Sequence, residues 1–154
     1  MRHSSSDGSG TAAGELVALG CHDDYASQTR LLVVSVVSGA LMADWISPIS
    51  SRYQTDVGAV RFDAGYVCAA FWGDEGNVPT AVVLDASAGP SAPPLLAFAS
   101  PGSMYACEVL RDAAASNSTH DSVYASFSGK HTPANNGGCG GDAYAFHFDV
   151  KHVN

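Results

Sequence analysis

The chain has 154 residues, of which 46% are hydrophobic and 14% are charged. This composition is typical of a folded globular domain and excludes a disordered chain, and one hydrophobic core is enough at this length. The formal net charge is −8, and none of the seven Lys and Arg residues stands next to another. Because a phosphate backbone is bound by clustered cations, we expect no nucleic-acid partner.

Residues 1–14 are rich in Ser and Gly, which is typical of a flexible tail. The sequence therefore predicts a tail over residues 1–14 and a single domain over residues 15–154. The uninterrupted apolar runs, such as Leu31 to Val34, are far shorter than the ~20 residues that cross a bilayer. We expect no membrane insertion, and the sequence leaves the oligomeric state open.

Ten short runs with the composition and alternation of β-strands follow the tail, with turn residues between them. In chain order they cover residues 15–19, 30–37, 41–46, 59–62, 66–72, 80–84, 95–99, 104–110, 121–127 and 144–153. Helix signals are limited to residues 42–50 and 111–115. The pattern predicts an all-β fold, a single-domain antiparallel β-sandwich, with a closed β-barrel as the alternative that periodicity alone does not separate.

Three connectors have the chemistry of hairpin turns. They are Ser38-Gly39, Asp63-Ala64-Gly65 and Ser100-Pro101-Gly102-Ser103. Each is short enough to join antiparallel neighbours, and Pro101-Gly102 suits a type II turn because Gly accepts a positive φ. The sequence therefore predicts three hairpins.

The clearest alternation lies in the last two runs, where apolar and polar residues take turns and predict one solvated sheet face. In the last run the inward set is Tyr144, Phe146, Phe148 and Val150, and the outward set is His147, Asp149 and Lys151. With His120 or His131 nearby, the outward stripe has the components of an acid and base site in a ribonuclease or esterase. Polar residues on a solvated strand face also need no function.

Four cysteines lie 47, 39 and 32 residues apart, without a CxxC pair or the clustering of Cys and His that a structural zinc site shows. This even count and wide spacing favour disulfides over zinc, and therefore an extracytoplasmic location, secreted or periplasmic. We favour Cys68 with Cys107, since both stand in the middle of apolar runs, and Cys21 with Cys139, since both stand near Gly. Each disulfide would stabilise the fold by ~2 to 4 kcal/mol.

Cys107 and His120 form the sharpest catalytic hypothesis. They stand thirteen residues apart on successive predicted strands, and antiparallel neighbours can bring a thiol and an imidazole within hydrogen-bond reach. Such a pair would serve a small Cys/His enzyme, a deamidase- or peptidase-like toxin. In the opposing interpretation Cys107 is half of a core disulfide, on the same strand face as Tyr105 and Val109. The two exclude each other, because a cystine sulfur is not an attacking thiolate.

Two polar, Gly-rich loops, residues 72–79 and 128–142, have the composition of a binding surface. The candidate binding residues in them are Trp72, Asp74, Glu75, Asn77, Asn135 and Asn136. The acidic residues of the first loop could also offer oxygen atoms to calcium, but the chain lacks the alternating acidic spacing of a calcium loop. We therefore expect no metal and no cofactor.

These observations favour a disulfide-stabilised binding or effector protein that recognises a protein or glycan partner through its loops. The chain contains no GxSxG or HExxH motif that would favour an enzyme. Two alternatives remain beside this function. One is the Cys107 and His120 enzyme, and the other is a structural subunit of an assembly such as a capsid or surface layer.

Overall fold

The computed structural model describes residues 15–23, 28–48, 57–72, 80–100, 103–131 and 140–152, so the predicted tail lies outside the described residues. Each of the ten predicted runs overlaps one strand. The strands are β1 (Leu16–Asp23), β2 (Gln28–Ser35), β3 (Leu41–Ile46), β4 (Val57–Asp63), β5 (Tyr66–Phe71), β6 (Ala81–Asp85), β7 (Leu96–Phe98), β8 (Ser103–Asp112), β9 (His120–His131) and β10 (Gly140–Lys151), and one 3-10 turn, η1, covers Ala86–Ala88.

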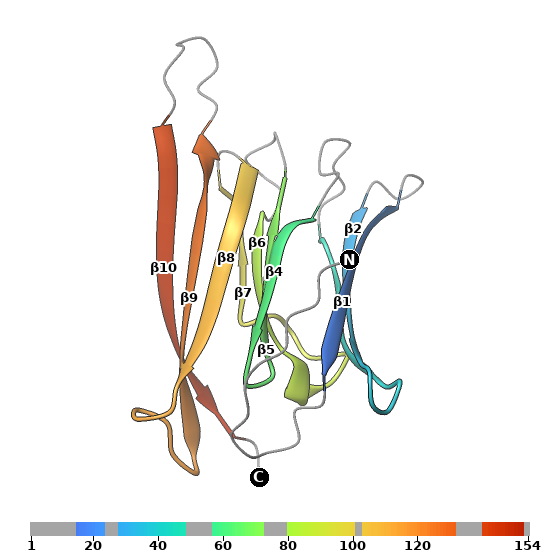
Figure 1. Cartoon of the computed structure of the whole chain (residues 1–154), viewed down its shortest axis with the longest axis vertical. Helices are drawn as coiled ribbons and strands as arrows, with labels where there is room; N and C mark the ends of the chain where they lie inside the picture. The colour runs from blue at the N-terminus through green and yellow to red at the C-terminus, as the bar shows by residue number, and fades with distance from the viewer. Residues whose placement is uncertain are drawn as a thin grey trace.

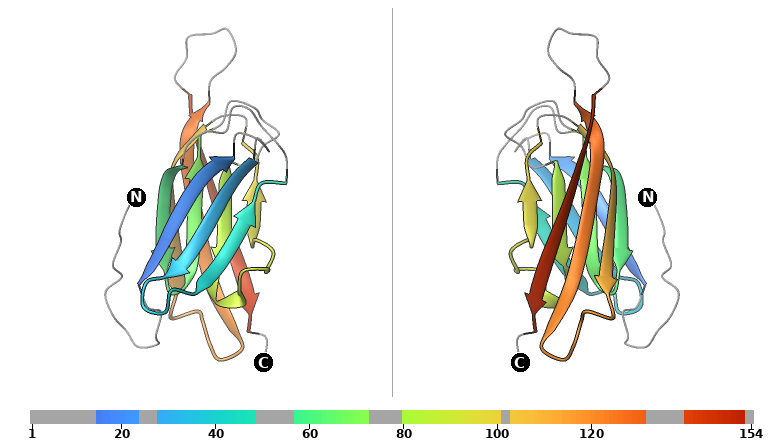
Figure 2. Two further views of the ribbon diagram at one scale, coloured as in Figure 1. Left: turned by 90° about the vertical axis from the view of Figure 1, so that its right-hand side faces the viewer. Right: turned by 90° about the vertical axis from the view of Figure 1, so that its left-hand side faces the viewer.

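The strands form three antiparallel sheets, with the orders β1-β2-β3, β4-β5-β6-β7 and β10-β9-β8. Figure 1 shows them as three layers, with the four-stranded sheet in the middle, and Figure 2 shows each outer sheet face-on. The all-β prediction is confirmed, and the sheets do not close into a barrel. Within the described ranges, no helix is long and apolar enough to cross a membrane.

The middle sheet is covered on both faces, and β5 shows this most clearly because all six of its residues are buried. Tyr66, Cys68 and Ala70 belong to the core shared with the β8–β10 sheet. The alternate residues Val67, Ala69 and Phe71 belong to the second core, shared with the β1–β3 sheet. A strand buried on both faces is expected to be apolar without alternation, and residues 66–71 have that sequence.

Two of the three predicted hairpins are present. The β4–β5 turn uses Ala64 (φ 48°) and Gly65 (φ 90°), both in the left-handed region that tight hairpins require, and Gly39 (φ 69°) serves the β2–β3 turn. The third hairpin is wrong. β7 pairs with β6 in the middle sheet, whereas β8 pairs with β9 in an outer sheet. Turn chemistry predicts that the chain reverses direction, but not which sheet the next strand joins.

A register shift in β8 changes which side chains point outward. The shift lies between Met104 and Ala106 in the pairing with β9, as in a β-bulge. Met104 and Cys107 are buried, while Tyr105 between them is 39% exposed. The prediction that Tyr105 shares a strand face with Cys107 is therefore wrong, because the bulge turns it toward solvent.

Ala69→Leu tests the double coverage of β5. Ala69 is fully buried against the second core, so the larger side chain has no space and should lower the free energy of unfolding by about 1–3 kcal/mol. The matched control is Ala145→Leu, on the exposed face of β10, for which a change within about 0.5 kcal/mol is expected. Urea denaturation of both variants measures the difference, and equal values would contradict the three-layer core.

Candidate functional site

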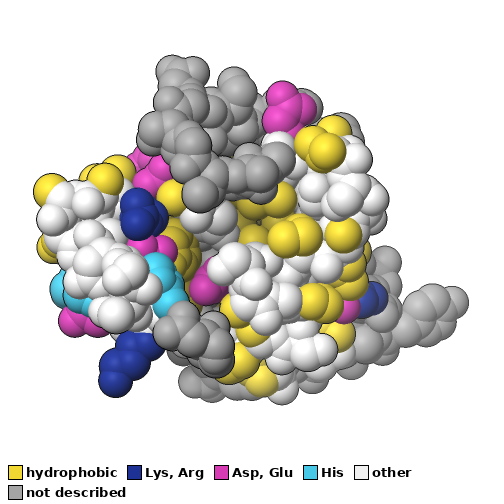
Figure 3. All heavy atoms as spheres, turned by 90° about the horizontal axis from the view of Figure 1, so that it is seen from below, with side chains coloured by type: hydrophobic (Ala, Val, Ile, Leu, Met, Phe, Trp, Pro, Cys, Tyr) yellow, Lys and Arg dark blue, Asp and Glu magenta, His cyan; other side chains and the backbone are white. Residues whose placement is uncertain are grey.

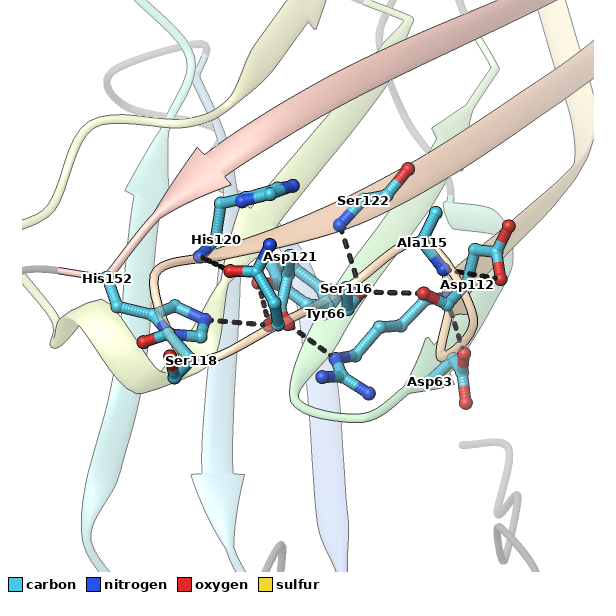
Figure 4. A network of polar contacts seen from close by, with 12 residues as sticks. Asp63, Tyr66, Asp112, Ala115, Ser116, Ser118, His120, Asp121, Ser122 and His152 are labelled. Atoms are coloured by element: carbon cyan, nitrogen blue, oxygen red, sulfur yellow. Dashed lines mark hydrogen bonds and ion pairs between the residues drawn. The ribbon is translucent and has the colours of Figure 1, made fainter.

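Asp121 is the centre of a polar network at the lower end of the sandwich in Figure 1, drawn in detail in Figure 4. Its side chain is 12% exposed. Asp121 Oδ2 accepts a hydrogen bond from the Tyr66 hydroxyl at 2.8 Å, and Oδ1 accepts one from Arg111 Nε at 2.7 Å. His152 Nε2 lies 3.3 Å from Oδ2. One carboxylate thus ties together β5, β8, β9 and the residue that follows β10.

Further contacts hold the same end of the molecule. Asp63, at the end of β4, accepts a hydrogen bond from the backbone N–H of Arg111 at 2.6 Å. His152 donates its backbone N–H to the carbonyl of Thr119 at 2.9 Å, and its Nδ1 lies 3.1 Å from the carbonyl oxygen of Ser118. Seen from this end, His and acidic side chains gather on the side of the β8–β10 sheet (Figure 3).

The network shifts the pKa values of Asp121, Tyr66 and His152, and each shift has a physical cause in the contacts described above. Burial acts to raise the pKa of Asp121, but hydrogen bonds from Tyr66, Arg111 and His152 outweigh it and hold the pKa below its ordinary 3.8. Burial and the bond to Asp121 raise the pKa of Tyr66 well above 10.0. The Ser118 carbonyl, followed by Asp121, raises the pKa of His152 above 6.5. The shifts favour a charged Asp121 carboxylate, a neutral Tyr66 hydroxyl and a protonated His152 imidazole, which are the forms that pair with one another.

The outward stripe of β10 does not assemble a Ser-His-Asp triad. Ser122 Oγ lies 2.8 Å from His147 Nε2, and Asp149 Oδ1 lies 3.6 Å from the same Nε2. In a triad the carboxylate orients Nδ1 while Nε2 takes the proton from the Ser hydroxyl. Here both partners meet one nitrogen atom, and the ring of Tyr124 stacks on the imidazole at 4.6 Å. Lys151 follows on the same exposed face, and the described contacts do not join its side chain to this group.

Cys107 and His120 are not brought together. In the β8–β9 pairing Cys107 lies opposite Phe127, which is seven residues further along β9 than His120, or about 23 Å at the usual rise per strand residue. Cys107 is 2% exposed and faces the middle sheet. His131 ends β9 at the far end from His120, and its side chain lies outside the described residues. The geometry offers no thiol and imidazole pair for catalysis.

Cys107 instead meets Cys68 across the core between the middle sheet and the β8–β10 sheet. The two thiols approach to 2.6 Å, and burial, followed by the Cys107 thiol, raises the pKa of Cys68 far above 9.0. The three described cysteines form no disulfide. Cys21 is exposed on β1, opposite Arg30, and Cys139 lies outside the described residues. Both predicted pairings therefore stay predictions, although the structure places the members of the first in contact.

Trp72 and Tyr105 form an exposed aromatic pair at the end of the sandwich opposite the Asp121 network. Their ring centroids are 5.1 Å apart and the rings meet edge to face, at 83°. Trp72 is 46% exposed and Tyr105 is 39% exposed. Gly58 permits this position, because a Cβ atom there would lie 2.7 Å from Nε1 of Trp72 and 2.9 Å from the Met104 carbonyl oxygen.

The other predicted binding residues lie outside the described residues; they are Asp74, Glu75, Asn77, Asn135 and Asn136. The outer face of the β8–β10 sheet holds a shallow groove of about 320 Å³, with a floor that includes Ala106, Ser126 and Ala145. In the part of the chain that the structure describes, no group of three or more His, Cys, Asp or Glu side chains could hold a metal ion.

No protein-family model, curated protein or solved structure matches this chain. The functional argument therefore depends on the geometry described above.

His152→Ala tests how the contribution of the Asp121 network to stability depends on pH. Because the pKa of His152 is raised on folding, its contribution to stability is complete below pH 6.5 and is lost as the pH rises through the raised value. The Asp121 contribution, from a lowered pKa, is present above pH 3.8 and is lost as the pH falls. His152→Ala should thus lower the free energy of unfolding more at about pH 5.5 than at about pH 8.5.

His120→Ala is the matched control, because His120 has no carboxylate partner among the described contacts. Its effect on the free energy of unfolding, measured by urea denaturation at about pH 5.5, should be smaller than that of His152→Ala, because it breaks no ion pair with Asp121. An effect of His152→Ala that does not change with pH would contradict the proposed charge pairing between His152 and Asp121.

Proposed function

We propose that this chain is a non-catalytic binding protein, which holds a protein or glycan partner at the end of the sandwich that carries Trp72 and Tyr105. The observation that carries the proposal is the exposure of this aromatic pair. Trp and Tyr side chains each combine a large apolar contact area with one polar atom that can stay in contact with water. They contribute much of the binding energy at protein interfaces.

The surroundings of the pair support this proposal. Gly58 lies close against the Trp72 ring, and Tyr105 packs on it edge to face, so little conformational entropy is lost when a partner covers it. β5 and β9 end, and β8 and β10 begin, at this same end (Figure 1), so the segments 73–79 and 132–139 start from strands beside the pair. The opposite end is occupied by the Asp121 network and offers no comparable exposed aromatic pair among the described contacts.

Trp72→Ala and Tyr105→Ala test the proposal. A glycan array and cross-linking to surface extracts identify the partner and tell a glycan from a protein. Each substitution should then weaken binding to it by at least about tenfold. Tyr124→Ala, an equally exposed aromatic on the outer face of β9, should change affinity by less than about twofold. A partner whose affinity falls with Tyr124→Ala and not with the first two variants would contradict the proposed location.

We further propose that the protein works in an oxidising compartment, secreted or periplasmic, where Cys68 and Cys107 form a disulfide between two layers of the sandwich. Their buried contact supports this. Oxidation removes two electrons and two protons from the thiols, and a thiol–disulfide oxidoreductase or glutathione disulfide would accept them. By loop entropy alone, a cross-link over 39 residues would stabilise the fold by about 4 kcal/mol.

Thiol alkylation tests the pairing in protein taken from an oxidising compartment. After unfolding without reductant, Cys68 and Cys107 should remain unmodified in the mass spectrum, and both should react once reductant is added. Cys21 is exposed. Where Cys21 is unpaired, its modification serves as the positive control for the alkylating reagent. Modification of Cys68 and Cys107 in the unfolded, unreduced protein would rule out both the disulfide and the inferred compartment.

A further inference from the structure

β10 is a long sheet edge without a bulge, and its charged side chains are Asp142, Asp149 and Lys151. It pairs with β9 over twelve residues without a register shift, and it is the last strand of its sheet. Natural proteins protect edge strands by shortening them, by bulges or by covering them. β7 has only three residues, and β3, β4 and β8 each carry a register shift. β1 is regular but shorter, and its Gly20 packs against Val57 of β4.

The inner face of β10 is apolar from Tyr144 to Val150 and only half-buried. Tyr144, Phe146 and Phe148 pack as a row against the core, and Phe98 of β7 touches the first two at 4.7 Å and 5.6 Å between ring centroids. Because β7 is so short, the middle sheet does not extend under the whole row. Apolar area therefore remains at this edge of the sheet, where β10 pairs with one strand only among the described strands.

On the outer face of β10, the first half of the strand carries small side chains and the second half carries large ones. Gly141, Ala143 and Ala145 come first, followed by His147, Asp149 and Lys151. An antiparallel pairing of β10 with a second β10, centred on Phe146, places each small residue opposite a large one. Ala143 then faces Asp149 of the second copy, and no like charges face each other.

On the inner face the same register continues the aromatic row across the two copies. Phe146 faces Phe146, and Tyr144 faces Phe148 of the second copy, which are pairs that stabilise antiparallel strands. A register shifted by two residues along one strand loses some of these aromatic pairs or of the pairs of small with large residues. Centring on His147, for example, sets His147 opposite His147 and shortens the overlap.

We propose that β10 pairs with β10 of a second copy of this chain, so that two β8–β10 sheets join into one six-stranded sheet across a two-fold axis. Such an interface is isologous, since each copy contributes the same strand. It adds backbone hydrogen bonds along the free edge and covers the aromatic row. It lies apart from Trp72 and Tyr105, so each copy keeps its own binding end.

Ala143 gives the test, because it is exposed and lies at the edge without a role in the core. Ala143→Lys places a cation opposite Asp149 of the second copy, twice per dimer, and should lower the dimer dissociation constant by about tenfold. Ala143→Glu places like charges there and should raise it by about tenfold. Sedimentation of the full chain over a concentration series measures both.

The matched controls are Ala106→Lys and Ala106→Glu. Ala106 is exposed in the same row of the sheet, since Ser128 pairs with Ala106 on one side and Ala143 on the other, but it stands on the opposite edge. These controls should leave the dissociation constant unchanged, and hydrogen exchange of the wild-type chain should slow in β10 as the dimer forms. A wild-type chain that stays monomeric at every concentration overturns the proposal, and so does a dimer that responds to Ala106 and not to Ala143.

Discussion

The structure depends on one constraint, which is that the middle sheet is covered on both faces. A strand in this position has no solvent side, so β5 must be apolar at every residue, and its neighbours must be small enough for two outer sheets to approach. β6 meets the same condition, with Ala81, Val82, Val83 and Leu84 all buried. The outer sheets then need only one apolar face each, which accounts for the alternation in β9 and β10. The low charge of the chain follows from this architecture, because three layers leave few strand faces to solvent.

The two ends of the sandwich differ in the side chains that they carry, and the proposed function depends on this difference. At one end a buried carboxylate, Asp121, joins strands from two sheets to the last described residue through three hydrogen-bonding partners. A buried charge in such a position stabilises the fold only when all of its partners are present, so this end has little freedom to serve a ligand. At the other end, Trp72 and Tyr105 expose large apolar rings that the fold does not use. Exposed aromatics held in fixed positions are the feature that partner recognition most often exploits.

Most of the secondary structure, and part of the site, could be predicted from the sequence. Alternation and turn residues locate all ten strands, and the parity of Val123, Ala125 and Phe127 also places Asp121 inward, a signal that identifies the buried network. The unbroken apolar run at residues 66–71 indicates a strand buried on both faces. The bulge at Tyr105 and the change of sheet after β7 leave no comparable signal, because both depend on pairing between distant segments. For that reason, the sequence does not predict that Tyr105, one of the two residues of the aromatic pair, is exposed.

Geometry also decides between the chemical roles of residues that composition leaves open. Ser122, His147 and Asp149 are the right types for a triad, yet Ser122 and Asp149 share Nε2, and no contact in the described part of the chain orients the imidazole at Nδ1. Cys107 is the right type for a nucleophile, yet it lies beneath a sheet, far from His120 and against a second thiol. A nucleophile needs access for its substrate and a base for its proton, and the core provides neither. What the core does provide for Cys107 is Cys68, its partner in the proposed disulfide between the two layers.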